Sequence, residues 1–260
     1  MKLGSFPAIN EDKTIDEAVE LAKSSDVAVL VVGLDQDWES ESYDRPNLSL
    51  PLRLNDLVRR VAVEAPDTKT VVVLQTGSAV SMPWLENVDS VMWPWYGGNE
   101  AGNAIADIIY GKVNPSGRLP ITLPKRELDI AANLNFRSAR TTTYYEEGIW
   151  VGYRHFNARG IEPMYPFGHG LSYTEFEYSQ LTVTPSTCTS PSSWRIKVSV
   201  DVTNTGGLAG SHSVHFYTAP PPPTSNSLMH PEVTLQAFTK TSVLSPGESE
   251  TVTVEMDKCK

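Results

Sequence analysis

The hydrophobic pattern of this chain changes its period near residue 173, and this change constrains the fold more than any other feature. Before that point, helical patterns alternate with short continuous apolar runs. After it, apolar and polar residues alternate one by one, and turn-forming residues separate the runs. The first pattern is typical of an α/β layered domain and the second of antiparallel sheets. The sequence therefore predicts two domains, at residues 1–172 and 173–260.

The first half contains alternating helix and strand patterns. Residues 14–23 carry apolar side chains at helical spacing, and residues 26–33 form an apolar run that suits a parallel strand covered on both faces. The further expected elements are a helix at 52–65, strands at 69–74 and 88–93, and a helix at 99–110. With right-handed crossovers, this order gives an α/β layered sandwich around a partial, mostly parallel sheet.

The second half is expected to form a small all-β sandwich. Strand patterns occur at 177–183, 195–202 and 251–255, with turn sequences between them. Residues 119–170 show little regular periodicity and are too many for a plain linker. We expect this connecting segment to wrap on the first domain.

Composition and charge exclude several classes of function. The formal net charge is −10 and no basic stripe is present, so a phosphate backbone would be repelled and nucleic acid is not an expected partner. No apolar run approaches the roughly 18–20 residues of a membrane span. The first residues show no secretory signal, and the sequence indicates no particular compartment. The two cysteines, Cys188 and Cys259, lack metal-ligand spacing.

An acidic and aromatic loop follows the first predicted strand. It contains Asp35, Asp37, Trp38, Glu39, Glu41, Tyr43, Asp44 and Arg45. Ligands of open α/β sheets bind at the carboxyl ends of strands. Aromatic rings stack on the apolar faces of sugars, and carboxylates accept hydroxyl hydrogen bonds or move protons. The loop therefore indicates either a sugar site or a solvated acidic surface, and it lacks the ligand pattern of a calcium loop.

Other catalytic patterns have less support. There is no Gly-x-Ser-x-Gly sequence, and no histidine has a nucleophilic partner in the sequence. Residues 96–102 resemble a phosphate-binding turn but lack the Gly-x-Gly-x-x-Gly order. Asn99 is better interpreted as a helix cap and His169 as a turn residue.

Taken in order, the loop sequences resemble glycoside hydrolase family 3, in its fungal β-glucosidase branch. The matching segments are residues 38–45, 82–85, 95–107, 111–120, 148–154 and 165–174, then 202–206 and 244–248 in the sandwich. The resemblance covers nearly the whole chain. It implies that the second domain is a fibronectin type III-like sandwich, and that a barrel domain carrying an aspartate nucleophile precedes the α/β domain in the family.

The resemblance also implies an activity and site residues. Family members hydrolyse terminal non-reducing β-D-glucosyl residues, as in cellobiose and other β-glucosides, with retention. They use neither a metal nor an organic cofactor, so none is expected here. This chemistry uses two carboxyl groups about 5–5.5 Å apart. The family's acid/base position falls on Glu41, and Trp38, Asp44 and Arg45 are expected to bind substrate. No nucleophile is expected in this chain.

Two departures from the family pattern affect these expectations. Ser42 occupies the usual glycine position of the motif, and a positive φ there would strain a serine. A (β/α)8 barrel needs about 250 residues, which the sequence does not contain before the first helix. We therefore expect a truncated product or fragment, weakly active or inactive alone.

Two functional hypotheses follow from the sequence. The first is a β-glucosidase chain that carries the acid/base half of the site. The alternative is a non-catalytic carbohydrate-binding or chain-association module derived from such an enzyme. In either case, loss of neighbouring elements would leave an apolar face near residues 27–32, and we expect self-association through it.

Overall fold

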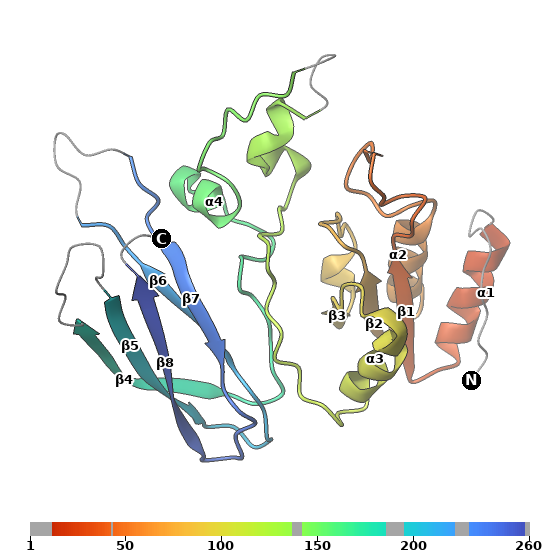
Figure 1. Cartoon of the computed structure of the whole chain (residues 1–260). Coiled ribbons are helices and arrows are strands. Elements are labelled where there is room, and N and C mark those ends of the chain that lie inside the picture. Colours follow the sequence, from red (N-terminus) through yellow and green to blue (C-terminus); the bar gives the residue numbers. More distant parts are fainter. Residues whose placement is uncertain (1–11, 43, 137–141, 186–194, 222–228, 258–260) are drawn as a thin grey trace. The chain divides into compact units, whose positions relative to one another are not determined.

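The computed structural model describes residues 12–42, 44–136, 142–185, 195–221 and 229–257. The chain divides into two compact units between Ile105 and Ala106, and each unit is described by itself (Figure 1). Cys188 and Cys259 lie outside the described residues. The proposed domain division between residues 172 and 173 stays a prediction.

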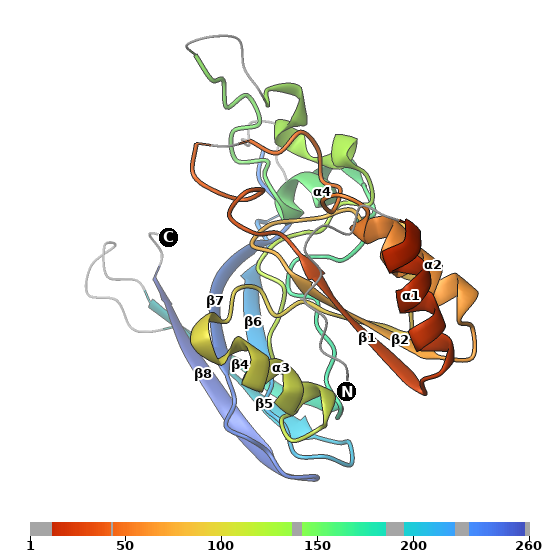
Figure 2. The same ribbon diagram turned by 90° about the vertical axis from the view of Figure 1, so that its right-hand side faces the viewer.

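The first unit is built on a parallel sheet with the strand order β1-β2-β3. Its strands are β1 (Val27–Gly33), β2 (Lys69–Gln75) and β3 (Ser90–Met92), and its helices are α1 (Asp12–Lys23) and α2 (Leu54–Glu64). The two helices lie side by side (Figures 1 and 2). The predicted helix–strand alternation and the parallel sheet are confirmed.

Apolar side chains at helical spacing form much of the core of this unit. The buried residues are Ile15, Val19 and Ala22 of α1, and Leu57, Val58 and Val61 of α2. In β2, the consecutive residues Val72, Val73 and Leu74 are fully buried, so both faces of this strand are covered. A short 3-10 turn, η1 (Leu85–Asn87), precedes β3.

Strand β1 is covered on one face only. Val27, Val29 and Val31 are 52%, 42% and 58% exposed, whereas Val32 is buried. Alternate side chains of a strand point to opposite faces of the sheet. The expectation that this apolar run is covered on both faces is therefore wrong for β1, although it holds for β2.

The second unit contains an antiparallel β-sandwich. The described strands are β4 (Phe176–Pro185), β5 (Arg195–Asn204), β6 (Ser213–Thr218), β7 (Thr234–Lys240) and β8 (Ser249–Asp257). They form one sheet in the order β4-β5-β8 and a second of β6-β7 (Figure 1). The core between them is lined by Val198, Val200, Val202, Val214, Phe216, Leu244 and Val252. The predicted order of an α/β domain followed by a fibronectin type III-like sandwich is confirmed.

The segment 119–170 belongs to the second compact unit, and the expectation that it wraps on the first domain stays a prediction. It contains η3 (Glu127–Asp129), η4 (Ala131–Leu134) and α4 (Tyr153–Arg159). The hydroxyl of Tyr153 accepts a hydrogen bond of 2.9 Å from the amide of Leu235 in β7. Backbone bonds between Leu123 and Tyr165 close the segment on itself. Its irregular backbone groups thus find partners within the unit that contains the sandwich.

The helix predicted at residues 99–110 begins later than expected. It is α3 (Ala101–Ile109), which crosses the division between the units and follows the 3-10 turn η2 (Gly98–Glu100). Asn99 lies inside this turn, whose N-cap position is Gly97 and has no side-chain cap bond. The interpretation of Asn99 as the helix cap is therefore wrong.

Candidate active site

The acidic loop leaves β1 and turns back at once. The carbonyl oxygen of Asp35 accepts hydrogen bonds from the amides of Trp38 (3.0 Å) and Glu39 (2.9 Å). Its Oδ1 atom accepts a further bond of 2.9 Å from the amide of Asp37. Aspartate favours such turns because its side chain can bond the backbone two residues on. Asp35 therefore shapes the loop that carries the candidate residues.

Glu39 joins the segments that follow all three parallel strands. Its Oε2 atom accepts hydrogen bonds from the amide of Gly77 (2.8 Å) and the hydroxyl of Tyr96 (2.6 Å). Its Oε1 atom accepts one from the hydroxyl of Ser78. Gly77 and Ser78 follow β2, and Tyr96 follows β3. The carboxyl ends of the strands are thus tied together through one carboxylate.

The protonation states of this cluster follow from its contacts. Partial burial alone would raise the pKa of Glu39, but hydrogen bonds from Ser78, Tyr96 and Gly77, with the charge of Arg45, hold it below its usual value. Burial and the bond to Glu39 raise the pKa of Tyr96 to about 12. Near neutral pH, Glu39 is therefore an anion and Tyr96 a neutral donor. A carboxylate held in this state is poorly suited to donate a proton.

Gly77 allows the close approach of the two loops. A Cβ atom at this position would lie 2.8 Å from Cε2 of Tyr96 and 3.0 Å from Oε2 of Glu39. Both distances are shorter than ordinary van der Waals contact. A residue without a side chain is therefore required for the Glu39 carboxylate to reach the backbone amide.

Glu41 is placed differently from Glu39, although only one residue separates them. It is exposed, and within the described part of the chain no side chain hydrogen-bonds its carboxylate. The next residue, Ser42, has a φ of 66°. This is the left-handed conformation that the glycine of the family motif would adopt without strain. Glu41 is thus an exposed carboxylate on a backbone segment held in an unfavourable conformation.

The other three predicted site residues lie on the same β1–α2 connection. Trp38 is half-buried and Asp44 is exposed, whereas Tyr43 lies outside the described residues. Arg45 donates from Nη2 to Oγ of Ser78 (2.8 Å) and to the carbonyl oxygen of Ala79 (2.9 Å). Among the described residues, no hydrogen bond or ion pair links Trp38, Glu41 and Asp44 to one another. Their roles in substrate binding stay predictions.

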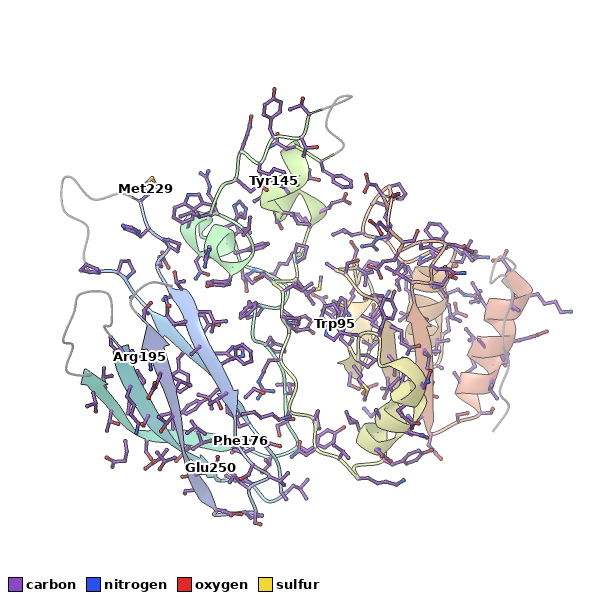
Figure 3. The ribbon with its side chains drawn as sticks, in the orientation of Figure 1. Trp95, Tyr145, Phe176, Arg195, Met229 and Glu250 are labelled. Atoms are coloured by element: carbon purple, nitrogen blue, oxygen red, sulfur yellow. The ribbon has the colours of Figure 1, made fainter. Side chains whose placement is uncertain are left out.

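The two tryptophans that follow β3 were not among the site residues predicted from the sequence. The rings of Trp93 and Trp95 lie 5.6 Å apart between centroids, and Trp95 has a φ of 57°. A positive φ is rare for a bulky residue, and such conformations cluster at functional sites. Figure 3 labels Trp95. The signal that would have found these residues is their position directly after a predicted parallel strand, where ligands of such sheets bind.

The described residues form neither a candidate metal site nor a helix that could cross a membrane. No group of three or more His, Cys, Asp or Glu side chains there is arranged to hold a metal ion. None of the helices in the same part of the chain combines the length and apolar character needed to cross a membrane.

The chain is similar to family 3 glycoside hydrolases over almost all its length. Residues 5–173 match the glycosyl hydrolase family 3 C-terminal domain, and residues 212–260 match the fibronectin type III-like domain. A protein of Aspergillus fumigatus named as probable β-glucosidase I is 41% identical over 259 residues. Its counterpart in Emericella nidulans is 40% identical. In each case the match covers 99% of this chain and 30% of the relative.

Solved structures show the same relationship. The β-glucosidase of Kluyveromyces marxianus, in complex with glucose, is 42% identical with a TM-score of 0.85. That match covers 97% of this chain and 29% of the yeast chain. β-Glucosidase 3B of Thermotoga neapolitana, in complex with α-D-glucose, is 36% identical with a TM-score of 0.83, over 96% of this chain and 35% of its own. This chain belongs to glycoside hydrolase family 3.

Proposed function

We propose that this chain supplies the acid/base half of a retaining β-glucosidase site, with Glu41 as the general acid/base. One observation carries the proposal. The loop after β1 contains two glutamates, and Glu39 is engaged in three hydrogen bonds whereas Glu41 is exposed. The relatives and solved structures named as β-glucosidases, two of them in complex with glucose, support the reaction class.

The proposed chemistry assigns two proton transfers to Glu41. In its protonated form it donates a proton to the leaving-group oxygen while a nucleophilic carboxylate forms a bond to the anomeric carbon. In its ionised form it then takes a proton from the water that cleaves this glycosyl–enzyme bond. The nucleophile is assigned to the barrel domain that the family resemblance implies, because no residue of this chain is proposed for that role.

Three neighbours are proposed to bind the sugar. The half-buried ring of Trp38 can stack on the apolar face of a pyranose, and the exposed carboxylate of Asp44 can accept hydroxyl hydrogen bonds. Arg45 keeps part of its guanidinium on Ser78 and Ala79, so its contribution combines loop anchoring with a positive charge beside the substrate.

A second candidate function is a non-catalytic module that binds carbohydrate or another chain. The exposed valines on one face of β1 favour it, because three apolar side chains there lack cover. We propose self-association through this face as the form that chain association takes. Carbohydrate binding by such a module would still use the loop that carries Glu41.

The decisive experiment compares two forms of the protein. The purified 260-residue chain should hydrolyse an aryl β-glucoside no faster than its Glu41→Gln variant, because an acid/base alone cannot form a glycosyl–enzyme. Joined to a family 3 barrel domain of the kind that the resemblance implies, the chain should be active. There, Glu41→Gln should lower the rate on an alkyl glucoside by about 10²–10⁴-fold. The effect should be much smaller on a dinitrophenyl glucoside, whose leaving group needs no protonation.

Asp37→Asn is the matched control, since it removes a carboxylate from the same loop and should leave both rates unchanged. Full activity of Glu41→Gln in the joined protein would reject Glu41 as the acid/base. Turnover by the isolated chain that Glu41→Gln abolishes would reject the half-site proposal. Sugar binding without turnover in either form would favour the module.

A further inference from the structure

We propose that Glu39 is a positioning residue that fixes the loop carrying Glu41 against the segments after β2 and β3. The inference rests on the proposed function of Glu41 and deepens it, because it names what holds the acid/base in place. Glu39 itself is not proposed to touch substrate or to transfer a proton. Its three hydrogen bonds all run to protein groups.

The loop needs such an anchor because of its length and irregularity. It connects the end of β1 at Gly33 to the start of α2 at Leu54, and the described residues between them form neither a helix nor a strand. An irregular segment of this kind retains many conformations unless specific contacts remove them. The Asp35 turn orders only its beginning. Precise placement of a side chain further along requires contacts there.

The structure provides those contacts on both sides of Glu41. Two residues before it, Glu39 bonds Gly77, Ser78 and Tyr96. Four residues after it, Arg45 bonds the same Ser78 and the carbonyl oxygen of Ala79. Glu41 and the strained Ser42 therefore lie between two points that are attached to the segment after β2. Such bracketing also explains how a serine is held at a φ of 66°.

The groups at the two ends of the Arg45–Ser78–Glu39 chain determine the direction of its hydrogen bonds. A guanidinium only donates and a carboxylate only accepts, so Ser78 accepts from Arg45 and donates to Glu39. A glutamine at position 39 has one oxygen where the carboxylate has two. Its NH2 group would face a donor, or would force the Ser78 hydroxyl to turn around. The network therefore needs both the charge and the two oxygen atoms of the Glu39 carboxylate, and a neutral residue of the same shape should not replace it.

The test compares Glu39→Gln with the wild-type chain and with Asp37→Asn, which removes a carboxylate from the same loop without breaking a bond of this network. We expect amide hydrogen exchange at residues 40–42 to become about tenfold faster, or more, in Glu39→Gln, since bonds to charged groups are worth more than neutral ones. Carbon-13 relaxation should show a less ordered Glu41 side chain. Amides of β1 and β2 should keep their wild-type protection, and Asp37→Asn should match the wild type throughout.

A role in general stability would move the unfolding midpoint but not the order of the Glu41 side chain. The proposal would therefore be overturned if Glu39→Gln kept the wild-type exchange rates at residues 40–42 and the wild-type order of the Glu41 side chain. If Glu39→Gln fails to fold, Tyr96→Phe replaces it, because this variant removes one of the donors and should give a smaller change of the same kind. In the double variant, Tyr96→Phe should add nothing to Glu39→Gln, and an additive effect would also count against the proposal.

Rates measured in the barrel-joined protein separate the two hypotheses. Failure of Glu41→Gln to lower the rate would reject the acid/base proposal, whereas the exchange and relaxation results alone decide the role of Glu39. If Glu41 is the acid/base, Glu39→Gln should lower kcat on the alkyl glucoside more than it changes KM. An unchanged kcat together with a loosened Glu41 side chain would show that positioning by Glu39 does not serve catalysis, which overturns the functional part of the inference.

Discussion

Nη2 of Arg118 lies 3.1 Å from Nδ1 of His212, and this contact determines the tautomer of the histidine. Because a guanidinium can only donate, Nδ1 must accept, and the ring proton of the neutral histidine lies on Nε2. Nε2 is 2.6 Å from the hydroxyl of Tyr178. Burial, then the charges of Arg118 and His215, lower the pKa of His212 to about 4. The sandwich unit therefore holds this histidine neutral.

The first prediction is that acid destabilises this unit through His212. The ordinary pKa of 6.5 applies when the chain is unfolded, and the folded pKa is about 4. Between these pH values the unfolded chain binds a proton that the folded chain does not, so stability falls as the pH falls through this window. Urea unfolding between pH 7 and pH 4, followed at amides of β4 and β5, should show proton uptake on unfolding.

His212→Gln should reduce that proton uptake by up to one proton, and its stability should approach that of the wild type as the pH falls. His230, an exposed histidine outside this cluster, gives the control variant His230→Gln. Equal pH dependence in the wild type and His212→Gln would contradict the assignment. His169 and His215 have pKa values lowered by burial and by Arg118, so some proton uptake should remain in His212→Gln.

The second prediction concerns the strain at Ser42. Its φ of 66° is a conformation that glycine adopts without a Cβ penalty. Ser42→Gly should stabilise the first unit by about 0.5–1 kcal/mol, the strain relieved exceeding the entropy that glycine adds to the unfolded chain. Ser40→Gly is the matched control, because Ser40 has no positive φ and should lose a similar amount. Urea unfolding of both variants measures this difference. Destabilisation by Ser42→Gly would contradict the strain inferred at Ser42.

The third prediction concerns Gly77. An alanine there would press on the Tyr96 ring and the Glu39 carboxylate, so one of them must move and the bond between them must lengthen. The pKa of Tyr96 should then fall from about 12 toward its ordinary value of 10, which ultraviolet titration of the phenol would measure. Gly102→Ala is the control, since a Cβ at Gly102 meets nothing within 4 Å. An unchanged Tyr96 titration in Gly77→Ala would count against the clash.

Burial periodicity explains how much of the fold could be predicted from the sequence. The apolar runs of β1 and β2 and the spaced apolar residues of α1 are strong local signals, and the parallel sheet follows from their order. β6 was missed because His215 and Tyr217 alternate with Val214 and Phe216, so polar–apolar contrast is weak along the strand. α4 has only seven residues, too short for a helical period to stand out.

The position of the candidate site could be predicted from the sequence, but the contacts between its side chains could not. The loop after β1 was found because an acidic, aromatic segment follows a strand end. The different environments of Glu39 and Glu41 depend on Gly77, Ser78 and Tyr96, which lie 38, 39 and 57 residues from Glu39. No local pattern encodes contacts at that separation. The family resemblance supplied the choice of Glu41, and the structure adds a physical reason for the difference between the two carboxylates.

The last prediction concerns self-association through β1. This strand is at one edge of the described sheet, and its face with Val27, Val29 and Val31 is about half exposed. Burying the exposed part of the three valine side chains would contribute about 2–4 kcal/mol to association. The open strand edge can add backbone hydrogen bonds.

The wild-type chain should therefore show a mass that rises with concentration in light scattering, and it should bind a hydrophobic dye. Val29→Lys and Val31→Lys should weaken both effects, because burying a lysine charge in the contact is unfavourable. Leu21→Lys, an equally exposed apolar position on α1, should leave both effects unchanged. A monomer at every concentration, or equal loss of association in all three variants, would show that this face of β1 is not the contact.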